Sequence, residues 1–316
     1  MLTFVVLVLF LASLTGLGAE VLKRPLMRWI EAQPWKGRMI PLQRQTMHNF
    51  GFSKACTADE HLVVDSYAFL IMICSHHCVM SIFLAPVVFL GWEGAGSIGQ
   101  LFFYLGAVGD LAFSVYDSIQ IALRTFASKS TSKFLGARLP VKYFVSMVCL
   151  HHSLSMLLTL PMIIHYPSMK ALHLIMSSLL FAGGTCYLLG CYKFTLDTKN
   201  SSDFLRYKAV VVVQLLIIWL TRGYIWISQA YAAMRFFYQQ GDVVFFCGAM
   251  TGGLLMSLFN LLMLVDATKA ALKWLPRPLK QHKTRDVTHL SCDESVPLKQ
   301  GLHKRLQGLN RAAVAQ

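Results

Sequence analysis

Charged side chains are scarce in this sequence. They make up 14% of its 316 residues, whereas hydrophobic residues make up 55%. A soluble globular domain contains about a quarter charged residues and fewer apolar ones. The composition therefore excludes an ordinary water-soluble domain and predicts an all-α polytopic membrane protein.

Paired cysteine motifs are also missing. The chain has eight cysteines but no CxxC spacing, and six of them lie in apolar segments: Cys74, Cys78, Cys149, Cys186, Cys191 and Cys247. We interpret these six as small, buried packing residues. The sequence predicts no metal site and no resident cofactor.

The chain does contain long apolar stretches. Seven are long enough to cross roughly 30 Å of hydrocarbon, and they begin near Leu2, Val64, Ile98, Val141, Ala171, Ala209 and Val243. We therefore expect four parts: an N-terminal transmembrane anchor at 1–20, a basic cytoplasmic linker at 21–60, a transmembrane domain at 61–275 and a basic cytoplasmic tail at 276–316.

Lysine and arginine predict the orientation. Seven lie between Val21 and Leu62 and none between Gly91 and Gly99, and this alternation continues along the chain. Because cytoplasmic loops carry the basic excess, we expect the N-terminus to be lumenal or extracellular and the C-terminus cytoplasmic. The alternative is a cleaved signal peptide, but the segment at Met1 lacks a basic n-region.

We attribute the net charge of +14 to basic loops that face anionic lipid on the cytoplasmic side. No recognition motif accompanies this charge, so nucleic acid is not an expected partner. Membrane lipids are the expected partners.

A few ionisable side chains fall inside the apolar stretches, where polar groups are expensive and usually functional. They are Asp110, Asp117, Arg222, His173 and the pairs His76-His77 and His151-His152. Asp110 and Asp117 are seven residues apart and so share a helix face, about 10 Å apart along the axis. We expect Arg222 to pair with one of these acids or to line the same cavity.

The two histidine pairs occupy corresponding places in their segments, each ten residues before a proline. This predicts that both pairs lie near the same membrane depth. Neighbouring histidines on a helix point about 100° apart, so only one of each pair can face a given spot. A structural alternative to catalysis is that these imidazoles hydrogen-bond between helices.

The order of these features resembles a known family. The stretch "FFYLGAVGDLAFSVYDSIQIAL" precedes a basic loop, a helix with a His-His pair, a helix with a buried Arg and the closing helix "FNLLMLVDATKAALK". The matching positions are Tyr116-Asp117, His151-His152, Arg222, Asn260 and Lys269. Together they resemble the TLC domain family over about residues 61–275.

The resemblance implies six transmembrane helices in a barrel around a lipid-sized cavity, in the endoplasmic reticulum or at the plasma membrane. The family includes ceramide synthases of sphingolipid metabolism and TLC proteins of lipid homeostasis. In the synthase branch two acids follow the histidine pair, but this chain has no Asp or Glu from Ser153 to Lys193. The sequence is therefore more similar to the lipid-homeostasis branch.

Two functions follow from this resemblance. The first is a protein that binds or senses lipid and influences membrane lipid composition. The alternative is an acyl-CoA-dependent N-acyltransferase with acyl-CoA as substrate, in which a buried histidine is the general base. The candidate catalytic residues are His151, His152 and Asp117. Asp110, Arg222, His76 and His77 are candidates for the lipid cavity or for ion pairs.

Two other classes fit the sequence less well. A G-protein-coupled receptor would also have seven spans, but the third lacks an Asp-Arg-Tyr-like triplet and the seventh lacks an Asn-Pro-x-x-Tyr-like motif. A haem carrier would need one histidine from each pair to face the other across a planar group.

The orientation can be tested by glycosylation. Asn200-Ser201-Ser202 matches the acceptor sequon, and we expect it to stay unmodified in microsomes because its loop faces the cytoplasm. A sequon placed ahead of Met1 on a spacer should be glycosylated. Modification of Asn200, or of a matching sequon placed after Gln316, would reverse the assigned orientation.

Overall fold

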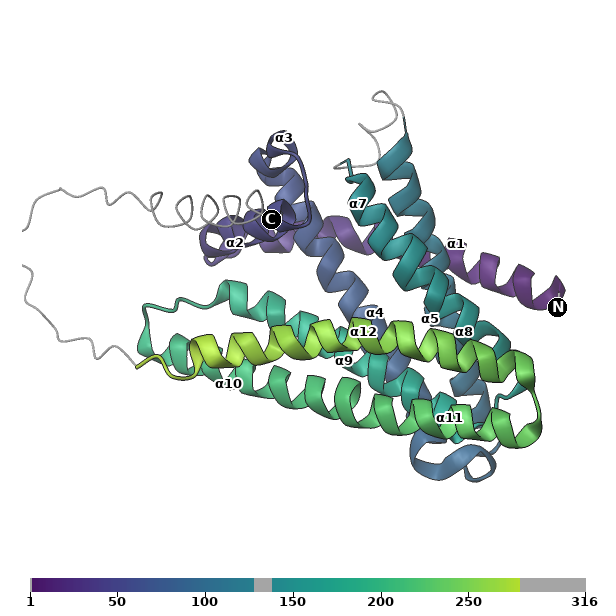
Figure 1. Ribbon diagram of the computed structural model, residues 1–316. Coiled ribbons are helices and arrows are strands. Elements are labelled where there is room, and N and C mark those ends of the chain that lie inside the picture. The colour runs from purple at the N-terminus through teal and green to yellow at the C-terminus, as the bar shows by residue number, and fades with distance from the viewer. Residues whose placement is uncertain (1, 128–137, 279–316) are drawn as a thin grey trace, which may run out of the picture. The chain divides into compact units, whose positions relative to one another are not determined.

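The described chain is helical apart from short connections. A computed structural model describes residues 2–127 and 138–278, with side chains from residue 6 (Figure 1). Seven of its helical spans are long and apolar enough to cross a membrane. Many of their leucines and valines are exposed, among them Leu254, Leu258 and Leu262, as lipid-facing positions require. The predicted fold class, an all-α polytopic membrane protein, is confirmed.

The spans follow one another through the chain. They are α1 (Leu2–Glu31), α4 (Glu60–Gly94), α5 (Gly96–Phe126), α7 to α8 (Val141–His165), α9 (Lys170–Thr195), α10 to α11 (Ser201–Gln240) and α12 (Val243–Trp274). The first span does not end near residue 20 as expected but continues to Glu31. The expected linker at 21–60 is also largely helical and contains α2 (Lys36–Asn49) and α3 (Lys54–Ala58). Most of the expected tail, 279–316, lies outside the described residues.

Two spans change their winding near the middle. The fourth runs from α7 (Val141–Phe144) through a π-helical segment, η1 (Val145–His152), to α8 (Ser153–His165). The sixth runs from α10 (Ser201–Ile218) through a second π-helical segment, η2 (Trp219–Ile225), to α11 (Trp226–Gln240). π-Helix is rare in proteins, and where it does occur it is often at a functional site. These two segments carry His151-His152 and Arg222.

Six of the spans are arranged as a ring. α4 packs against α5 and α9, α5 packs against the fourth span, and α9 and α12 both pack against the sixth. Figure 1 shows α12 beside α10 and α11, which follow one another in the sixth span. α8 and α12 complete the ring, while α1 packs on α4 and α5. That this ring encloses a lipid-sized cavity stays a prediction.

The seam between the fourth span and α12 has a regular spacing. The rings of His151 and Phe259 are 5.4 Å apart, and those of His165 and Phe245 are 5.8 Å apart. Between them the side chain of Leu158 lies against Gly252. Successive contacts are seven residues apart on both helices, so this junction is built from rings, one leucine and one glycine.

Polar contacts hold other junctions. Lys23 of α1 forms an ion pair with Asp65 of α4 at 3.2 Å, and the Tyr67 hydroxyl donates to the carbonyl of Cys191 on α9 at 2.8 Å. Between the spans, the Tyr166 hydroxyl donates to Asp242 Oδ2 at 2.6 Å. This bond lowers the pKa of the Asp242 carboxyl, which also caps α12 by accepting from the Phe245 N–H.

Small residues allow close helix approach. A Cβ atom at Gly184 of α9 would lie 2.7 Å from the Cys74 carbonyl oxygen and from the Cys78 nitrogen on α4. At neighbouring Gly183 nothing lies within 4 Å. The cysteines fit the packing interpretation only in part, because Cys74, Cys186 and Cys191 are buried while Cys149 and Cys247 are exposed.

The paired glycines provide a test of the α4–α9 contact. Gly184→Ala should lower the free energy of unfolding by about 1–3 kcal/mol, since backbone atoms of α4 must move to make room. Gly183→Ala should leave it unchanged. Thermal unfolding of both variants in detergent would measure the difference, and equal stabilities would contradict the described packing.

Candidate functional site

Asp117 and His152 form a buried hydrogen bond between two spans. Asp117 lies on α5, His152 is the last residue of η1, and His152 Nε2 is 2.8 Å from Asp117 Oδ2. Each side chain is only 6% exposed. A carboxylate can only accept hydrogen bonds, so opposite a carboxylate Nε2–H is the donor and Nδ1 is the ring's remaining nitrogen. The carboxylate thus fixes both the tautomer and the orientation of the ring.

His77 and Asp110 make a weaker contact, at the neighbouring junction between α4 and α5. His77 Nδ1 on α4 is 3.2 Å from Asp110 Oδ1 on α5, but neither atom has a hydrogen bond of acceptable geometry among the described residues. Phe113 packs against both histidines of this pair, with ring centroids 4.7 Å from His76 and 5.6 Å from His77. We interpret this pair as interhelical packing with a charge contact.

The two histidine pairs contact α5 at different levels. Their acidic partners, Asp110 and Asp117, are seven residues apart, which is about 10 Å along a helix. The contacts of the two pairs with α5 are therefore offset along this helix, and the expectation of a shared membrane depth stays a prediction.

His151 faces a different helix from His152, as expected for consecutive residues, while the two ring centroids are 5.3 Å apart. Its ring lies against Phe259 of α12, whereas His152 faces α5. His151 Nδ1 is buried and has no hydrogen-bond partner among the described residues. Of the two adjacent imidazoles, one is fixed by a carboxylate and the other retains an unpaired nitrogen.

Arg222 does not pair with either acid, so the expectation of an Arg–Asp pair is wrong. Its Nη1 instead donates to Asn260 Oδ1 on α12 at 2.8 Å. The guanidinium carbon lies 5.8 Å from the centre of the Phe259 ring. Arg222 is 7% exposed and Asn260 1%.

These groups form one polar cluster inside the ring of spans. Asp110 interacts electrostatically with His152 as well as with the α4 histidines. His151 interacts with Arg222, His77 and Asp110. The alternative expectation for Arg222, that it shares the polar interior with the acids, thus fits its place beside His151. Five spans contribute to the cluster: α4, α5, the fourth, the sixth and α12.

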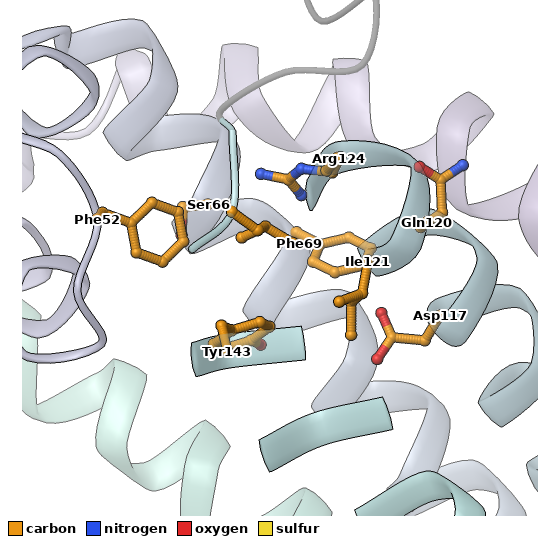
Figure 2. A pocket seen from close by; sticks show the side chains of 9 residues that line it. Phe52, Ser66, Phe69, Asp117, Gln120, Ile121, Arg124 and Tyr143 are labelled. Carbon is orange, nitrogen blue, oxygen red and sulfur yellow. The ribbon is translucent and has the colours of Figure 1, made fainter. Parts of the chain in front are cut away.

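A small cavity adjoins Asp117 on the side of α5 where α7 lies (Figure 2). Its volume is about 40 Å³, enough for a few water molecules. The polar residues that line it are Ser66, Asp117, Gln120, Arg124 and Tyr143. Asp117 therefore contacts His152 and also this polar space.

His173, the remaining intramembrane histidine, has a structural place. It is 1% exposed, its Nε2 is 2.6 Å from the carbonyl oxygen of Pro167, and its ring stacks on Trp92 at 5.6 Å. In the described part of the chain, no group of three or more His, Cys, Asp or Glu side chains is placed to hold a metal ion.

Sequence reasoning identified most members of the cluster but missed the roles of Phe259 and Asn260. Asn260 entered only as a position of a motif, yet an amide in an apolar stretch is itself a signal, because it needs a partner in hydrocarbon. Phe259 carries no such signal. It is recognisable only once His151 and Arg222 are seen on its ring.

Comparisons with known proteins find no relative. No protein-family model matches the chain, and neither the curated proteins nor the solved structures contain a significant match. The resemblance to the TLC domain family therefore rests on the order of its motifs.

A double-mutant cycle separates the two His–Asp contacts. Asp117→Ala and His152→Ala should show a coupling of about 1–3 kcal/mol, as for a buried hydrogen bond to a charged group. The cycle with Asp110→Ala and His77→Ala should show a smaller coupling, because that contact lacks hydrogen-bond geometry. Unfolding in detergent measures both, and equal couplings would contradict the distinction.

Proposed function

We propose that this chain is a membrane-embedded acyltransferase of TLC type, which moves an acyl group from acyl-CoA to the amine of a lipid. The observation that carries the proposal is the buried hydrogen bond between Asp117 and His152. The sequence has no acid on the chain segment after the histidine pair, so an oriented base required a carboxylate from another helix. Asp117 of α5 meets that requirement.

In this proposal His152 is the general base. Its Nδ1 takes the amine proton as the amine nitrogen attacks the thioester carbonyl carbon. The carbon–sulfur bond then breaks, and the leaving thiolate takes the proton back from the imidazolium. Asp117 stays ionised throughout, stabilises the imidazolium and holds the ring.

The setting is consistent with an apolar substrate. Five spans deliver the polar cluster, and exposed apolar side chains cover the outside of several spans. A lipid acceptor would reach His152 from within the bilayer. We place this activity in the endoplasmic reticulum, or at the plasma membrane, with the N-terminus lumenal or extracellular.

A second candidate is a lipid-binding or lipid-sensing protein that influences membrane composition without chemistry. The cavity of about 40 Å³ beside Asp117 holds water but no acyl chain, so in either candidate the lipid chain lies outside this cavity. In this alternative the His152–Asp117 bond holds α5 against the fourth span.

An acyltransferase assay tests the proposal. The purified protein, in phospholipid nanodiscs, would be given long-chain acyl-CoA and a long-chain amine base. We expect amide product from the wild type and a loss of about 10²- to 10⁴-fold in kcat for His152→Gln and Asp117→Asn, the range for a general base. His77→Gln is the matched control, since His77 also contacts an acid on α5.

The control should retain activity within a few-fold of the wild type, and all variants must give one monodisperse peak with a cooperative thermal transition. Equal losses in His77→Gln and His152→Gln would assign the histidines a shared structural role. No product from the wild type across several chain lengths and amines would favour lipid binding.

A further inference from the structure

Arg222 has hydrogen-bonding capacity that the protein does not use. Its Nη1 donates to Asn260, but its Nε is buried without a partner among the residues described. Tyr187, Cys186 and His151 interact electrostatically with Arg222, and none of them is a carboxylate. A fixed charge inside a membrane span is expensive without a counter-charge.

Asn260 has a matching unused donor. Arginine can only donate, so the amide oxygen of Asn260 must face Nη1 and the amide nitrogen must face elsewhere. That nitrogen, Nδ2, is also buried and unpaired in the described part of the chain. Two adjacent side chains therefore present buried N–H donors, Arg222 Nε and Asn260 Nδ2, that have no acceptor among the described residues.

The missing partner is an oxygen acceptor, preferably a negatively charged one. The Nε edge of a guanidinium, opposite the Nη1 side that Asn260 occupies, is suited to carboxylate oxygens. Arg222 lies 21 residues after Ser201 and 18 before Gln240 in its span, which places it near mid-membrane. A phospholipid keeps its phosphate at the interface, whereas a single-chain lipid can bring its polar end to this depth.

We propose that Arg222 and Asn260 bind the acyl oxygens of a single-chain lipid, as a fatty carboxylate or as the carbonyl of its thioester. Arg222 and His151 both lie against the ring of Phe259, so the bound oxygen lies beside the imidazole with the unpaired nitrogen. The site is built on Arg222 and Asn260 alone and does not depend on the acyl transfer proposed above.

Binding of radiolabelled palmitate to the full chain in zwitterionic nanodiscs tests this site. Asn260→Asp places a carboxylate beside Arg222, so it should satisfy the guanidinium and weaken palmitate binding by about 10- to 100-fold. This variant should fold at least as well as the wild type, because it neutralises a buried charge. Arg222→Gln, which removes the charge, should weaken binding similarly.

Competition identifies the source of the oxygen. Unlabelled palmitate should compete with the radiolabelled palmitate, and hexadecanol should not. If palmitoyl-CoA also competes, and Asn260→Asp abolishes that competition, thioesters use the same site. Asp117→Asn should bind palmitate as the wild type does, even where it loses acyl transfer. Wild-type palmitate affinity in Asn260→Asp, or equal competition by hexadecanol, would overturn the proposal.

Discussion

A polar side chain inside hydrocarbon has no water to satisfy it, so it needs a partner on its own helix, on a neighbouring helix or in a bound ligand. Three contacts in this chain follow from that constraint. Asp117 joins α5 to the fourth span, Asp110 joins α5 to α4, and Arg222 joins the sixth span to α12. Each contact fixes the rotation of two spans about their axes, which apolar packing against lipid specifies poorly.

Helix α5 has a central place in this arrangement because its two acids face two different neighbours. The spacing of seven residues keeps both carboxylates on one side of the helix, and the ring geometry brings α4 and the fourth span to that side. Close packing at glycines complements these contacts. A Cβ atom at Gly106 of α5 would lie 2.9 Å from the Met80 carbonyl oxygen of α4, so the two helices approach almost to backbone contact.

The seven spans and most members of the polar cluster were predictable from the sequence, because hydrocarbon thickness and the rarity of intramembrane charge leave few alternatives. The partners were less predictable. Arg222 was expected beside an acid, yet it bonds to Asn260, since the choice depends on how each helix is rotated. The segments η1 and η2 alter that rotation and have no signal in hydrophobicity. The first helix was expected to be short because its basic end, from Lys23 onward, resembles a loop.

The π-helical segments also affect how such a protein can evolve. A π-helical turn contains one more residue than an α-helical turn closed by i→i+4 bonds, and it offsets the two halves of its span. Loss of one residue from η1 would restore an ordinary helix and rotate α8 relative to α7 by about 100°. α7 could then keep its contacts with α5, or the histidines and Leu158 could keep theirs, but not both. A single codon deletion would thus remove the site while leaving seven hydrophobic spans intact, so that descendants of one ancestor can share this architecture without sharing its chemistry.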